Sequence, residues 1–243
     1  VKFSEPIAGN YLRNINNFEV LGTLNSNDVN TSTSLYFDGI ALAMTQGNRN
    51  LTGKNFTVDL MVNPATDKRA MTLFSHGGEE KGLRLGLTED RHLMATINGQ
   101  TVQSDSAVTF TNALHQVAYA LDQSGEDMTI NFFDESTPIG SKTLTGKYEG
   151  SSSLSLGFDL MEYENGFKGD MLEFRLWNHA LNENSLDTYG KKRLTGYESG
   201  LLDYYPMNEG EGVWAYDKGP GSMDLMLINT DWKRPVHRHC LRR

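Results

Sequence analysis

Residues 93–99 read Leu-Met-Ala-Thr-Ile-Asn-Gly, an alternating apolar segment that runs directly into a turn dipeptide. The Leu, Ala and Ile of this stretch fall two positions apart, so their side chains share one face of a β-strand. Asn98 and Gly99 follow, and both tolerate the positive φ that a two-residue hairpin turn requires. The stretch therefore predicts one strand of an antiparallel hairpin.

The same alternation recurs along most of the chain. It is found in Phe56–Val62, Leu83–Leu87, His115–Leu121, Met128–Phe132, Leu154–Phe158 and Leu172–Leu176. Many short strands separated by turns are typical of an all-β sandwich or barrel. We expect one short helix near 183–192, because Asn182 can cap it and Lys191 and Lys192 fall at its C-terminus, where cations suit the helix dipole.

Composition excludes several classes of protein. The chain has 243 residues and a net charge of −9, which disfavours nucleic acid as a partner because phosphate backbones are also negative. Cys240 is its one cysteine, so an internal disulfide is impossible. The sequence contains neither an apolar run of about 20 residues, which membrane insertion through a helix needs, nor a visible signal peptide.

Four segments, in order, carry a resemblance to a known family. They are Ser34-Leu-Tyr-Phe-Asp-Gly39, Asn55-Phe-Thr-Val-Asp-Leu-Met-Val62, Phe167-Lys-Gly-Asp-Met-Leu-Glu-Phe-Arg-Leu-Trp-Asn178 and Gly200-Leu-Leu-Asp-Tyr-Tyr-Pro-Met-Asn-Glu-Gly210. Together they are similar to the laminin-G-like and pentraxin-like jelly rolls of the concanavalin A-like lectin/glucanase group. The resemblance implies an all-β fold, a two-sheet antiparallel jelly-roll sandwich with the one short helix near 183–192.

The resemblance also implies the domain organisation and a function. We expect residues 1–243 to form a single domain, with 200–243 as its closing strand and tail. The alternative is that 200–243 begins a following repeat. The implied function is a carbohydrate-binding or adhesion module of a larger multidomain, secreted or cell-surface protein. Its partners would be a glycan or an extracellular protein.

Two acidic loops are the candidate ligand-binding site. His76-Gly-Gly-Glu-Glu80 joins two predicted strands, and Asp159-Leu-Met-Glu-Tyr163 joins two others. In pentraxins, loops at these places supply carboxylates to a ligand-binding calcium. By resemblance, the candidate calcium ligands are Glu79, Glu80, Asp159 and Glu162, and His76 and Tyr163 beside them are candidates for contacting a sugar. The alternative is a solvated acidic surface.

A second calcium site of related jelly rolls is expected to be missing. These proteins often carry an Asp where this chain has Leu172, and an alkyl side chain cannot supply the oxygen ligand that Ca²⁺ requires. The sequence also lacks the E-x-D-x-x-E stretch that jelly-roll glucanases use. We therefore expect no catalytic residues and no enzymatic activity. Two alternatives stay open, a structural or protein-interaction spacer and a glycoside hydrolase with an unrecognised carboxylate pair.

Overall fold

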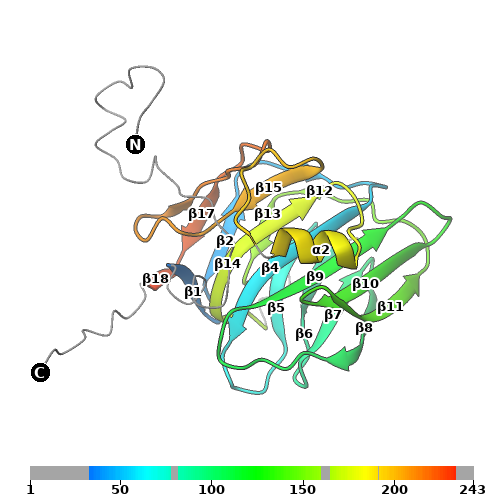
Figure 1. The fold of residues 1–243 in the computed structure, drawn as a ribbon, viewed down its shortest axis with the longest axis horizontal. Coiled ribbons are helices and arrows are strands. Elements are labelled where there is room, and N and C mark those ends of the chain that lie inside the picture. The colour runs from blue at the N-terminus through cyan, green and yellow to red at the C-terminus, as the bar shows by residue number, and fades with distance from the viewer. Residues whose placement is uncertain (1–32, 78–81, 160–164, 191, 234–243) are drawn as a thin grey trace, which may run out of the picture.

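The computed structural model of the chain describes residues 33–77, 82–159, 165–190 and 192–233. Two antiparallel β-sheets pack face to face, and one short helix lies across the outer face of one of them (Figure 1). This architecture confirms the predicted all-β, two-sheet jelly-roll class.

Sheet 1 is organised around one long central strand. Its order is β11-β10-β9-β4-β14-β1-β18, with β15 also paired to β14. The bounds are β1 (Ser34–Asp38), β4 (Phe56–Pro64), β9 (His115–Asp122), β10 (Met128–Asp134), β11 (Thr137–Leu144), β14 (Lys168–Trp177), β15 (Leu201–Tyr205) and β18 (Asp231–Lys233). β4 pairs with β14 along one side, whereas β1 and β15 pair with its first and second halves along the other.

Sheet 2 has the order β16-β17-β2-β13-β5-β6-β7-β8. Its strands are β2 (Leu42–Thr45), β5 (Met71–His76), β6 (Leu83–Leu87), β7 (His92–Ile97), β8 (Gln100–Ala107), β13 (Leu154–Leu156), β16 (Trp214–Ala215) and β17 (Leu225–Ile228). The short strands β3 (Arg49–Asn50) and β12 (Ser151–Ser152) form a separate pair. The hairpin predicted at Asn98-Gly99 is confirmed: the two residues join β7 to β8 with φ of 50° and 74°.

The apolar residues of the alternating segments meet between the sheets. Phe74 on β5 stacks on Phe174 on β14, with ring centroids 5.7 Å apart. The Tyr119 hydroxyl on β9 donates to the carbonyl of Gly86 on β6 at 2.6 Å, so a buried polar atom also ties the sheets together. Leu172 lies in this core and is fully buried. Truncating one of these Phe side chains to Ala would cost roughly 3–5 kcal/mol.

Helix α2 (Glu183–Gly190) packs on the outer face of sheet 1 through a second apolar cluster (Figure 1). The Asn182 side chain accepts from the Ser185 backbone N–H at 3.0 Å, so the predicted cap is confirmed. Trp177 lies beneath the helix and stacks on Tyr189 at 4.5 Å. The helix ends two residues before the predicted 192. Gly190 packs directly against the Gln116 side chain, where a Cβ would clash. Within the described ranges, no helix has the length and apolar character needed to cross a membrane.

Residues after 200 add strands to both sheets. β15 pairs with β14, β17 pairs with β2, and β18 pairs with β1. The segment that could have begun a following repeat therefore contributes pairing partners to strands that lie before residue 178. The domain limits of 1–243 stay a prediction.

Candidate functional site

The structure places two of the six predicted site residues, His76 and Asp159. Glu79, Glu80, Glu162 and Tyr163 lie outside the described residues. The strands that flank the two acidic loops are among the described residues.

His76 is buried, with 2% of its surface exposed. Its Nδ1 lies 2.5 Å from the Tyr148 hydroxyl, and its Nε2 lies 2.7 Å from the Arg49 carbonyl oxygen. Burial lowers the pKa of His76, which favours the neutral ring. Because both ring nitrogens are engaged inside the protein, His76 has a structural role, and the site proposed below does not include it.

Asp159 lies on the outer face of sheet 2, opposite to the side covered by α2. The hydroxyls of Ser75 and Ser155 both donate to the Phe158 carbonyl oxygen, at 3.4 and 2.8 Å. These bonds hold the chain leaving β13 across the outer face of β5. The next residue, Asp159, then places Oδ2 3.6 Å from Nη1 of Arg84 on β6. The described flanks of the two acidic loops therefore meet on one face of one sheet.

Polar side chains continue outward from this ion pair. Arg84 is the cross-strand partner of Thr96, and Thr96 is the partner of Thr101, so the three side chains share a row on the outer face. The hydroxyls of Thr96 and Thr101 lie 2.9 Å apart. In the other direction the same face carries Met44, Met226 and Trp214 as successive cross-strand partners, all partly exposed. The face thus has a polar half and an apolar half.

Arg84, Thr96 and Thr101 were not among the residues predicted for the site. The alternation of β6 and β7 predicts that their polar residues face solvent. It does not indicate that these residues bind a ligand. Trp214 is partly exposed on this face, whereas the next residue, Ala215, is buried. The crossing of the Phe158–Asp159 segment over the sheet distinguishes this surface.

The described residues do not by themselves fit a calcium site. Within those ranges, no cluster of three or more His, Cys, Asp or Glu side chains could hold a metal ion. Asp159 is the one predicted ligand among them, and the nearby guanidinium of Arg84 would compete with a cation. Calcium binding by Glu79, Glu80 and Glu162 together with Asp159 therefore stays a prediction.

The strand order and the helix over sheet 1 define a jelly roll of the concanavalin A-like type. The family model of the concanavalin A-like lectin/glucanases superfamily, of the laminin G type, matches residues 38–186, and the chain belongs to this superfamily. No match was found among curated proteins.

Two solved structures show how far the likeness extends. A candidate carbohydrate-binding protein from Bacteroides ovatus is 17% identical with a TM-score of 0.68, and the alignment covers 84% of this chain and 60% of that one. A heptameric pentraxin from Limulus polyphemus is 13% identical with a TM-score of 0.53, covering 65% and 82%. This chain thus spans about 60% of the length of the Bacteroides protein. Identities this low establish the shared fold alone.

Proposed function

We propose that this chain is a non-catalytic carbohydrate-binding module of a larger secreted or cell-surface protein, and that it binds glycans on the outer face of sheet 2. The observation that carries the proposal is the Arg84–Asp159 pair. Its side chains are 17% and 13% exposed, on a sheet face that the described helix does not cover. The superfamily and the description of the Bacteroides ovatus protein support the same class of ligand.

The chemistry of the pair matches sugar hydroxyls. A hydroxyl both donates and accepts, the Asp159 carboxylate only accepts, and the Arg84 guanidinium only donates. Hydrogen bonds to charged groups are worth about 1.5–3 kcal/mol each, so a few of them can hold a flexible polar ligand. Thr96 and Thr101 extend the row with groups that do both. Glu79, Glu80 and Glu162, which lie outside the described residues, are proposed to add acceptors, directly or through calcium.

An array of immobilised glycans tests the proposal, with the protein applied once in calcium and once in EDTA. We expect binding to a defined subset of glycans. Loss of that binding in EDTA would assign the contact to calcium, and binding in both buffers would assign it to the protein side chains. An array without any bound glycan would contradict the proposal and favour the structural or protein-interaction spacer.

The absence of catalysis is part of the proposal. The buried carboxylates Asp59 and Glu173 flank Arg175 and have no exposed surface, so they are not accessible to a glycan. We expect no hydrolysis of any glycan that the array retains. Release of reducing ends that a single carboxylate substitution abolishes would favour the glycoside hydrolase alternative instead.

A further inference from the structure

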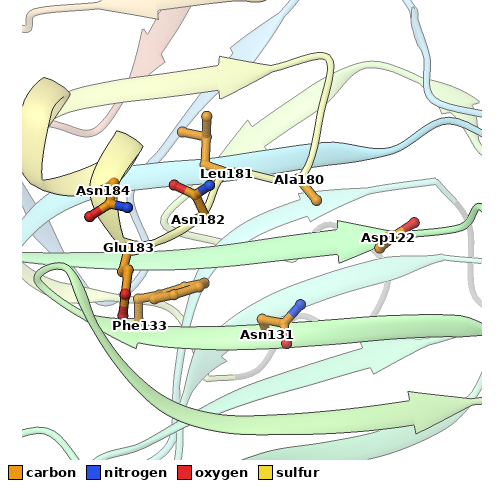
Figure 2. Close-up of a pocket in the computed structure, with 8 residues that line it drawn as sticks. All are labelled: Asp122, Asn131, Phe133, Ala180, Leu181, Asn182, Glu183 and Asn184. Carbon is orange, nitrogen blue, oxygen red and sulfur yellow. The ribbon is translucent and has the colours of Figure 1, made fainter.

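A groove of about 450 Å³ lies on the opposite side of the molecule, between the start of α2 and the outer face of β9 and β10 (Figure 2). This volume falls within the range of roughly 300–1,000 Å³ that small-molecule sites occupy. Its lining residues are Asp122, Asn131, Phe133, Ala180, Leu181, Asn182, Glu183 and Asn184. They come from two adjacent strands, from the segment that leads into the helix and from the first two residues of the helix, so elements far apart in sequence build the groove.

The floor of the groove is apolar and firmly anchored. Phe133 and Leu181 are 5% and 3% exposed, and both belong to the cluster that packs α2 onto sheet 1. Trp177 and Leu186 in the same cluster are fully buried. The Leu181 backbone N–H also donates to the Thr57 hydroxyl at 2.8 Å, which fixes the segment before the helix. The floor is therefore held in place before any ligand arrives.

The walls are lined with amides and carboxylates. Figure 2 shows Glu183 reaching down over Phe133, with Asn131 and Asp122 rising from the strands below Ala180. Within the described part of the chain, the side chains of Asn131, Glu183 and Asn184 make no hydrogen bond. Asp122 accepts from the Ser124 side chain and backbone, and these bonds lower its pKa, so it remains an ionised acceptor.

We infer that this groove is a second binding site, for an uncharged oligosaccharide. Amide side chains donate and accept, carboxylates accept, and together they complement hydroxyl groups that do both. The apolar floor suits the C–H face of a sugar ring. Asp122 and Glu183 both carry negative charge, and the lining contains neither Lys nor Arg. Sialylated, sulfated or uronic-acid glycans would meet repulsion here, whereas neutral glycans would not.

The groove adds to the proposed function without depending on it. It lies on the outer face of sheet 1, whereas Arg84 and Asp159 lie on the outer face of sheet 2. A module with sites on opposite faces can hold two glycan chains at once, which raises avidity on a polysaccharide surface.

Two variants distinguish binding in the groove from binding on the outer face of sheet 2. Asn131→Ala/Asn184→Ala removes two amides that make no hydrogen bond in the described chain, so the thermal midpoint should not change. Arg84→Met/Asp159→Asn removes both charges of the proposed site on the outer face of sheet 2. A matched control, Lys142→Met/Asp105→Asn, neutralises an ion pair on β11 and β8 away from both sites. The probes are neutral hexaoses of glucose, xylose, arabinose and mannose, together with 3′-sialyllactose and a heparin hexasaccharide.

Titration calorimetry in EDTA measures the affinity of each variant for each probe. We expect the Arg84/Asp159 variant to bind at least one neutral hexaose and neither charged glycan, and the Asn131/Asn184 substitutions to weaken that binding at least tenfold. Asn184→Trp, at an exposed position on the rim of the groove, should weaken it as well. The inference would be overturned by unchanged affinity in the groove variants, by absence of any neutral hexaose binding, or by equally tight binding of the charged glycans. Failure of the proposed sheet 2 site would appear separately, as wild-type affinity of the Arg84/Asp159 variant for an array-selected glycan in calcium.

Discussion

Arg175 Nη2 lies 3.0 Å from Glu173 Oε2, and both side chains are fully buried. A second carboxylate, Asp59, lies 3.3 Å from Nη1, and the Tyr204 hydroxyl donates to Glu173 at 2.7 Å. Glu173 has φ of 54° in the irregular stretch of β14, at the point where its neighbour changes from β1 to β15. The charged cluster therefore stabilises β14 at the position where its neighbouring strand changes from β1 to β15.

Removing the central cation of this cluster should be strongly destabilising. Arg175→Met leaves Asp59 buried without its guanidinium and leaves Glu173 with only Arg193, whose Nε lies 3.7 Å from Oε1. Losing one partner of a buried pair costs about 3–5 kcal/mol. Urea unfolding should show this loss of free energy of unfolding. Lys142→Met, which breaks a partly exposed pair with Asp105, should cost under about 1 kcal/mol. Equal losses in the two variants would contradict the role given to Arg175.

The C-terminal strands should be indispensable. Deleting residues 200–243 removes β15 and β17 and uncovers β14 and β2, which exposes apolar surface and unpaired strand edges. We expect an insoluble or unfolded product by circular dichroism. Cooperative unfolding at an unchanged urea midpoint would instead show that 200–243 starts a following repeat.

The contribution of Asp203 to stability should fall as the pH rises from about 4 to about 7. Burial raises its pKa to about 7, and Asp217 adds to the effect while Arg49 opposes it. In that pH window the native state retains a proton that the unfolded chain has already lost, so the free energy of unfolding decreases as pH increases. Asp203→Asn should flatten the slope of stability against pH. Identical slopes in the two proteins would show that Asp203 titrates normally.

Calcium binding at the acidic loops has a direct test. Titration of calcium into the wild-type protein should release or absorb heat that the Glu79→Ala/Asp159→Ala variant does not reproduce, because both carboxylates are proposed ligands. Leu172 is buried in the core and supplies no oxygen, so a second calcium event is not expected. Equal responses from the two proteins, or heat from neither, would leave a metal-free module.

Local patterns predicted the framework of the fold. Alternation located β4, β6, β7, β9, β10, β13 and β14, Asn98-Gly99 located a turn, and Asn182 located the start of α2. Alternation missed β8 and β11, eight residues each, because all but one residue of each strand is at least partly exposed and few are apolar. The resemblance supplied the topology that alternation alone leaves open.

The site depended on contacts that have no local signal. His76 is buried by Tyr148, 72 positions later, and Asp159 meets Arg84 only because Ser75 and Ser155 hold the crossing segment. Asn131 and Asn184 form part of a groove only because α2 packs over Phe133. Such long-range juxtapositions follow from sheet order and loop path, which a single sequence does not specify.

The affinity of the Arg84→Met/Asp159→Asn variant for a glycan selected on the array tests the central claim most directly. Calorimetry without EDTA, with Lys142→Met/Asp105→Asn as the control, should show at least tenfold weaker binding for the first variant at the sheet 2 site and wild-type binding for the control. Wild-type affinity in both variants would contradict glycan recognition on the outer face of sheet 2.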